Sequence, residues 1–121
     1  MLKIKSSLSF LQPIINEITD NLVNNHGFPL EKQVDVFLVL SELLVNAIEH
    51  GNKNIYDKKI LIYYYVLKDS VSFIIEDEGT GIDKNMLNEI KKSQGLSLIK
   101  ALVSCICWNE KGNKVCVKIL I

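Results

Sequence analysis

One segment limits the fold of this chain more than any other. Residues 30–50 fit a helix that Gly51 ends, and from residue 34 to residue 48 apolar side chains fall on nearly every side of it. A helix that is apolar nearly all round must be covered on several sides. It therefore belongs inside a layered fold, and a polar side chain buried on it needs a partner.

The rest of the chain predicts short strands and further helices around this segment. Strand-like runs occupy residues 2–5, 60–67, 71–76, 104–108 and 114–121, and helical patterns occupy residues 9–25, 86–90 and the segment that starts at Gly95. The predicted order β-α-α-β-β-α-α-β-β favours an α+β two-layer sandwich. We expect a mixed, mostly antiparallel sheet with helices on one face.

Composition excludes several classes of protein. The 121 residues, 48% of them apolar, can bury one core, and without a linker or repeat we expect a single domain over residues 1–121. The 14 basic and 14 acidic residues form no block of like charge, which argues against a nucleic-acid or membrane-surface binder. No run is long enough to span a bilayer, and residues 1–10 lack a signal-peptide core, so a cytoplasmic location is expected.

Three cysteines come late in the chain, at Cys105, Cys107 and Cys116. An odd number argues against a secreted disulfide scaffold. The C-x-C pair invites a metal interpretation, but no further Cys or His lies near it at zinc-like spacing. We therefore expect all three to be buried thiols on the last core elements.

Two polar residues stand on the apolar helix. Glu42 and Asn46 are four residues apart and share one face, which His50 continues. The amide oxygen of Asn46 suits Mg²⁺, and the carboxylate of Glu42 can take a proton from a nucleophile. Taken alone, the spacing fits a solvated polar stripe equally well.

A glycine-rich segment follows the strand at residues 71–76. Asp77 is followed by Gly79 and Gly81, and glycines let the backbone turn tightly and approach a flat ligand. A carboxylate at a strand end can accept a hydrogen bond from an exocyclic amine such as that of adenine. Read alone, this pattern is also that of an ordinary tight turn.

Gly95 lies where a polar loop meets the start of a helix, a place that favours phosphate. By itself it is equally a simple helix start. The order of the three features along the chain, however, suits a nucleotide. Adenine would lie at Asp77, magnesium at Asn46 and the phosphates at Gly95.

These segments resemble the sequence boxes of the GHKL ATPase superfamily, which is also known as the Bergerat or histidine-kinase-like ATPase fold. Residues 42–52 (ELLVNAIEHGN) match its N box, residues 77–83 (DEGTGID) its first glycine box and residues 95–100 (GLSLIK) its second. Within the superfamily the chain is most similar to bacterial anti-sigma-factor serine/threonine kinases, and the likeness covers nearly its whole length.

The resemblance implies an ATP-dependent protein kinase that uses Mg²⁺. It would phosphorylate a serine or threonine of an antagonist protein, sequester a sigma factor, and form a homodimer. Glu42 would be the general base and Asn46 the metal ligand. Asp77 would contact adenine, while Gly79, Gly81, Gly95 and Ser97 would shape the pocket, and His50 would support the helix end.

Two departures from the family pattern keep other functions open. The second box usually reads G-x-G, but Ser97 holds the last position, and residues 84–94 are short for an ATP lid. One alternative is a non-catalytic partner-binding module of the same fold with weak or no nucleotide binding. Another is the ATPase domain of a histidine kinase, although His26 is a poor phosphoacceptor candidate.

Overall fold

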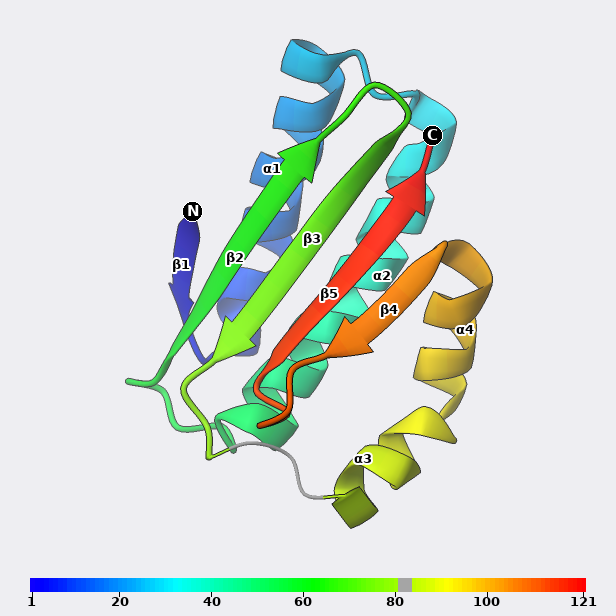
Figure 1. Cartoon of the computed structure of the whole chain (residues 1–121). Coiled ribbons are helices and arrows are strands. Elements are labelled where there is room, and N and C mark those ends of the chain that lie inside the picture. Colours follow the sequence, from blue (N-terminus) through cyan, green and yellow to red (C-terminus); the bar gives the residue numbers. More distant parts are fainter. Residues whose placement is uncertain (81–83) are drawn as a thin grey trace.

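A computed structural model gives the fold and describes residues 1–80 and 84–121. The elements in chain order are β1 (Leu2–Lys5), α1 (Leu11–His26), α2 (Gln33–Asn46), β2 (Lys59–Val66), β3 (Ser70–Asp77), α3 (Lys84–Lys91), α4 (Gln94–Leu102), β4 (Cys105–Trp108) and β5 (Lys114–Leu120) (Figure 1). Short 3-10 turns precede α1 and α2, at Leu8–Phe10 and Leu30–Lys32. The predicted order of strands and helices is confirmed.

The five strands form one sheet in the order β1-β2-β3-β5-β4. Each pairing between described strands is antiparallel, so the expected mixed character is not seen. The neighbouring strands β2 and β3 form a hairpin, in which Ile60 lies opposite Asp77 and Val66 opposite Val71. This register places the start of β2 beside the end of β3, where the glycine-rich segment begins.

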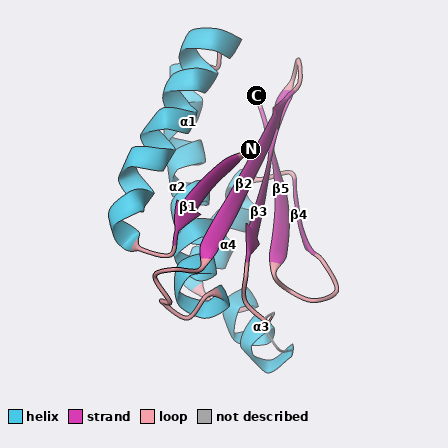
Figure 2. Ribbon diagram, turned by 90° about the vertical axis from the view of Figure 1, so that its left-hand side faces the viewer, coloured by secondary structure: helices cyan, strands magenta, loops and turns pink. Residues whose placement is uncertain are grey.

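The helices cover one face of the sheet, as the edge-on view shows (Figure 2). Side chains alternate between the two faces of a strand, so every second residue of the central strands points into the core. Phe73 and Ile75 of β3, with Ile60 and Ile62 of β2, are buried in this way against the helices. The α+β two-layer sandwich is therefore confirmed.

Helix α2 is the central helix of this layer. Its buried residues (Val36, Val39, Leu40, Leu43 and Leu44) face the sheet, α1 and α4, as the nearly all-round apolar pattern predicts. Its last turn widens into a π-helical turn at Ala47–Gly51. Wide turns of this kind are frequent at functional sites.

None of the described helices covers the opposite face of the sheet (Figure 2). Cys105 and Cys107 lie on this face and are exposed, and Cys116 is half-buried. The expectation of three buried core thiols was wrong. In β4 the inward-facing residues are Ile106 and Trp108, so the strand's alternation turns the neighbouring cysteines outward.

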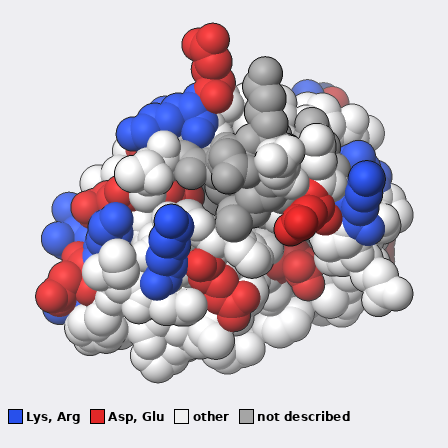
Figure 3. Space-filling view, turned by 90° about the horizontal axis from the view of Figure 1, so that it is seen from below, with Lys and Arg blue, Asp and Glu red and all other residues white. Residues whose placement is uncertain are grey.

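The end of the molecule nearest α3 carries basic and acidic side chains without a dominant sign (Figure 3). This agrees with the zero formal net charge of the chain. Within residues 1–80 and 84–121, none of the helices is both long and apolar enough to cross a bilayer.

Candidate functional site

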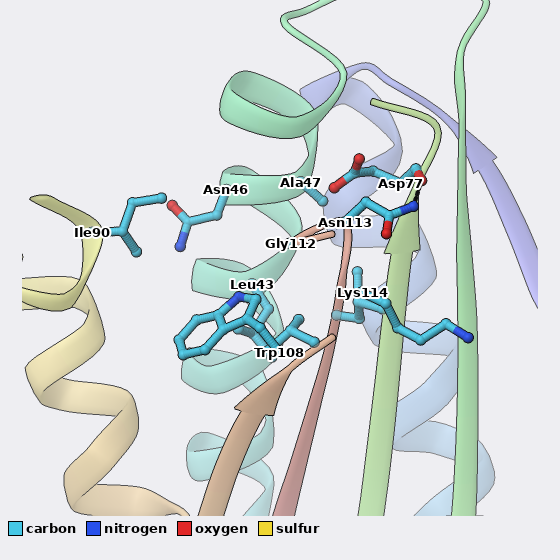
Figure 4. Close-up of a pocket in the computed structure, with 11 residues that line it drawn as sticks. Leu43, Asn46, Ala47, Asp77, Ile90, Trp108, Gly112, Asn113 and Lys114 are labelled. Carbon is cyan, nitrogen blue, oxygen red and sulfur yellow. Dashed lines mark hydrogen bonds between the residues drawn. The ribbon is translucent and has the colours of Figure 1, made fainter. Parts of the chain in front are cut away.

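A pocket lies at the end of α2, between this helix, the sheet and α3. Residues from α2, β3, α3 and the β4–β5 hairpin form its walls (Leu43, Asn46, Ala47, Ile75, Asp77, Ile90, Trp108, Gly112, Asn113, Lys114 and Val115). Figure 4 shows Asp77 beside Asn113 on one side and Asn46 opposite Ile90 on the other. The pocket thus unites two site residues that the sequence places 31 positions apart.

The carboxylate of Asp77 sits in a cradle of glycines. The backbone N–H of Gly79 donates to its Oδ1 at 2.8 Å. A Cβ on Gly51 would lie 2.2 Å from Asp77 Oδ2, and a Cβ on Gly79 would lie 2.1 Å from the Gly51 carbonyl oxygen. Only glycine at both positions allows the π-helical turn and the strand end to meet around this carboxylate.

Asp77 is only 7% exposed, and burial raises the pKa of its carboxyl group above the ordinary aspartate value. The hydrogen bond from Gly79 acts in the opposite direction, and the nearby charge of Glu76 raises the pKa further. Among the described residues, Gly79 is the one hydrogen-bond donor to this buried carboxylate, which suits it to a ligand that brings further donors.

Asn52 fixes the backbone around this carboxylate. Its side chain is fully buried, and its Oδ1 accepts the backbone N–H of Glu78 at 2.9 Å. Its Nδ2 donates to the carbonyl oxygen of Lys59 at 3.0 Å and to the hydroxyl of Ser6. One amide therefore ties the ends of β1 and β3 to the start of β2, directly beside Asp77.

The β4–β5 hairpin holds the other side of the same strand end. The backbone N–H of Asp77 donates to the carbonyl oxygen of Asn113 at 2.9 Å, and Asn113 Nδ2 donates to the Asp77 carbonyl oxygen at 3.2 Å. Gly112, at the turn, adopts a φ of 81°, a conformation that side chains disfavour. The turn between β4 and β5 thus forms part of the pocket wall.

Glu42 lies one turn before Asn46 on α2 and faces α4. A Cβ on Gly95 would lie 2.2 Å from Glu42 Oε2 and 2.6 Å from its Cδ, so this carboxylate fills the space that a side chain at residue 95 would need. Gly95, from the second glycine box, therefore contacts Glu42, the predicted general base. Both glutamate and glycine are half-buried.

Gly95 belongs to the first turn of α4, as predicted. Ser93 caps this helix, since its hydroxyl accepts the backbone N–H of Leu96 at 3.2 Å. Ser97 is exposed, and its hydroxyl donates to the carbonyl oxygen of Ser93 at 3.2 Å. The side chain that stands in place of the family's usual glycine is thus hydrogen-bonded within its own helix.

The remaining predicted residues are placed less centrally. His50 lies in the π-helical turn and is absent from the pocket lining. Gly81 lies outside the described residues. Across the described part of the chain, no three His, Cys, Asp or Glu side chains come together as a ready metal site.

Sequence reasoning missed Trp108, Asn113 and the role of Asn52. Asn52 is the last residue of the N-box string, and Asn113 follows Gly112 between two strand-like runs, so both carried a signal. Trp108 carried a weaker one. It is the sole tryptophan and ends a strand-like run, but only the pairing of β4 with β5 brings it to the pocket.

The pocket is narrow as it stands. The space inside it that is open to the centre of a water molecule is about 20 Å³. Trp108 and Ile90 are the large side chains at its border (Figure 4).

Comparison with known proteins bears on this site. The family described as "Histidine kinase-like ATPase domain" matches residues 4–119. A "Serine-protein kinase RsbW" from Listeria innocua serovar 6a is 27% identical over 62 residues, which make up 51% of this chain and 40% of that protein. The chain therefore matches less than half the length of this relative.

A solved structure shares the fold. The histidine kinase domain of the blue-light activated histidine kinase from Erythrobacter litoralis EL346 superposes with a TM-score of 0.63 at 21% sequence identity. The superposition covers 93% of this chain and 59% of that chain. At this identity the likeness concerns the fold alone.

Proposed function

The chain belongs to the histidine kinase-like ATPase domain family, and we propose that its pocket binds ATP with Mg²⁺ for transfer of the γ-phosphate to a serine or threonine of an antagonist protein. We further propose that the same domain holds a sigma factor inactive, so that phosphorylation switches partners. The likeness to the RsbW serine-protein kinase supports the protein-kinase assignment, although it covers only part of both chains.

The contact between Glu42 and Gly95 carries this proposal. The first backbone N–H groups of a helix lack intrahelical partners and attract phosphate, so phosphates at the start of α4 would lie next to the Glu42 carboxylate. A serine hydroxyl brought to the γ-phosphate would then be within reach of a base. Glu42 would take the hydroxyl proton as the new P–O bond forms and ADP leaves.

Adenine would occupy the other end of the pocket. The Asp77 carboxylate would accept a hydrogen bond from the exocyclic amine, and the close approach of the Gly51 and Gly79 backbones would hold that carboxylate in place. Apolar side chains at Leu43 and Ile75 would contact its faces. This arrangement distinguishes adenine from guanine, which presents a carbonyl oxygen at the same position.

Magnesium fits the donors that are present. Mg²⁺ in nucleotide sites takes few protein ligands and completes its octahedron with phosphate oxygens and water. The Asn46 side chain lines the pocket, one helical turn after Glu42 on α2, and offers one neutral oxygen. When bound, the cation would neutralise charge on the phosphates.

Incubating the full chain with labelled ATP and its antagonist protein, followed by phosphosite mapping, tests the proposal. Glu42→Ala should leave ATP affinity within about twofold and reduce phosphotransfer at least about 100-fold, because a base acts in the chemical step. Unchanged transfer by this variant would remove Glu42 from its role.

A second function from another class has some support. The exposed Ser97 and the narrow pocket favour a partner-binding module with weak or no nucleotide binding. For such a module, partner binding would be insensitive to ATP and to substitutions at Asp77. The kinase proposal predicts that ATP and substitutions at Asp77 each change partner binding.

A further inference from the structure

The three cysteines lie together on the open face of the sheet, away from the pocket. Cys107 of β4 and Cys116 of β5 are direct cross-strand partners, and Cys105 lies opposite Lys118. Directly opposite residues of two strands point to the same face, so Cys107 and Cys116 present their thiols side by side.

The strand pairing sets the distance between these two residues. The backbone N–H of Asn109 donates to the Lys114 carbonyl oxygen at 3.0 Å, which marks residues 109 and 114 as a hydrogen-bonded pair. Hydrogen-bonded pairs recur every second residue, so Cys107 and Cys116 form another, with Cα atoms about 5.5 Å apart. Disulfides most often join Cα atoms about 5.5–6 Å apart.

The strand that carries Cys107 is able to adjust. A disulfide brings Cβ atoms to about 3.8 Å, closer than most opposite residues, so one strand must twist slightly. β4 has four residues, lies at the sheet edge and pairs with β5 alone among the described strands. An edge strand this short can change its twist without disturbing a second neighbour.

We propose that peroxide converts Cys107 and Cys116 into a reversible disulfide that shifts Trp108 in the pocket wall. The exposed Cys107 thiolate attacks one oxygen of hydrogen peroxide, the O–O bond breaks, and one water and a sulfenic acid form. The Cys116 sulfur then attacks the sulfenic sulfur and loses its proton, and the hydroxyl leaves as a second water. Two thiols are oxidised by two electrons in total, and one peroxide is reduced. Thiol–disulfide exchange with a dithiol restores both thiols.

The roles of the two thiols follow from their exposure. Cys107 is exposed and accessible to peroxide, whereas Cys116 is half-buried and positioned to resolve the sulfenic acid. Burial raises the pKa of the Cys116 thiol, which makes it the less reactive toward peroxide of this pair. Cys105 is exposed as well, but it faces a lysine across the strand pair and has no opposite thiol.

The disulfide affects the pocket through the residues next to each cysteine. Trp108 follows Cys107, Val115 precedes Cys116, and both Trp108 and Val115 line the pocket. Neighbouring residues in a strand point to opposite faces. Drawing the two thiols together on the open face therefore tilts Trp108 and Val115, which face the pocket. The movement of Trp108 does not depend on what the pocket binds.

The test uses the full chain, fully reduced and then treated with equimolar hydrogen peroxide. The intact mass should fall by about 2 Da, as expected for one disulfide, and a dithiol should reverse the loss. Non-reducing tryptic digestion should join the peptide of residues 101–111 to that of residues 115–118. The emission of Trp108, the only tryptophan, should change with oxidation and recover on reduction.

Single serine variants assign the bond. Cys105→Ser should keep both the mass loss and the change in emission, and Cys116→Ser should lose both. A bond between Cys105 and Cys107 would stay within one tryptic peptide, and it would overturn the proposal. So would disulfide-linked dimers or sulfinic acid in the wild-type chain, and so would a 107–116 bond that leaves the Trp108 emission unchanged.

Discussion

The Glu42 carboxylate occupies the space where a side chain at Gly95 would lie, with 2.2 Å between Oε2 and the position of a Cβ. This contact joins the middle of α2 to the first turn of α4, through two residues that lie 53 positions apart in the sequence. It explains why a glycine stands early in a helix, where it costs about 1 kcal/mol relative to alanine.

Replacing Gly95 by alanine should separate stability from activity. The clash involves the flexible end of a glutamate side chain, which can move, and alanine favours the helix. We expect the free energy of unfolding of Gly95→Ala to lie within about 1 kcal/mol of the wild-type value. Its rate of phosphotransfer should fall at least about tenfold. Thermal melts and a transfer assay measure both, with the exposed Lys100→Ala as a matched change in the same helix. Full activity in Gly95→Ala would show that the position of the Glu42 carboxylate is unimportant.

Gly79→Ala, unlike Gly95→Ala, should lose stability. Here the added Cβ would lie 2.1 Å from the backbone carbonyl oxygen of Gly51, which cannot move without the π-helical turn. Overpacking of this kind costs about 1–3 kcal/mol, so denaturant unfolding should show a loss of stability in that range. A variant as stable as wild type would mean that the turn and the strand end are not held together.

Asn46→Ala should weaken nucleotide binding only when magnesium is present. The amide offers an oxygen to the cation and lines the pocket, so its loss removes one ligand. ATP affinity measured with Mg²⁺ should fall about tenfold, a difference of about 1.4 kcal/mol, and affinity measured with a chelator should not change. If affinity were equally insensitive to magnesium in both proteins, the ligand assignment would be wrong.

The free energy of unfolding of the ligand-free protein should fall as pH rises and the Asp77 carboxyl group loses its proton. Its pKa is raised in the folded state, so the folded protein holds this proton more tightly than the unfolded chain does. Stability contributed by the protonated form is therefore present at low pH. It is lost as pH rises from the ordinary aspartate pKa of about 3.9 to above the folded value.

Comparison with Asp77→Asn isolates this effect, since the variant has no proton to lose there. The free energy of unfolding of wild type minus that of the variant should fall across this pH range. Denaturant unfolding at a series of pH values measures it. A difference that rises with pH would indicate a carboxylate stabilised in its charged form.

The sequence predicted the fold well because its patterns are local. The 2-residue alternation of β2 and β3 and the all-round apolar α2 each specify an element and the face it buries. The cysteines show where this reasoning stopped short. Hydrophobic composition suggested burial, but a C-x-C pair that alternates with Ile106 and Trp108 on an edge strand must face outward.

The site was predicted in parts rather than as a whole. Asp77 and Asn46, which line the pocket, and Gly95, which contacts Glu42, were singled out because glycines and isolated polar residues on an apolar helix are conspicuous. The closure of the pocket by Trp108 depends on long-range strand pairing, and the support from Asn52 depends on three strand ends meeting. Neither follows from any local pattern.

Equilibrium binding of ATP and GTP to the wild-type chain and to Asp77→Asn, with Mg²⁺ present, tests the central claim most directly. A buried carboxylate that accepts a hydrogen bond from the adenine amine should give wild type a preference for ATP of at least about tenfold. In Asp77→Asn that preference should largely disappear while the protein stays folded. Absence of ATP binding at millimolar nucleotide, or an equal preference for ATP in both proteins, would contradict a nucleotide site built around Asp77.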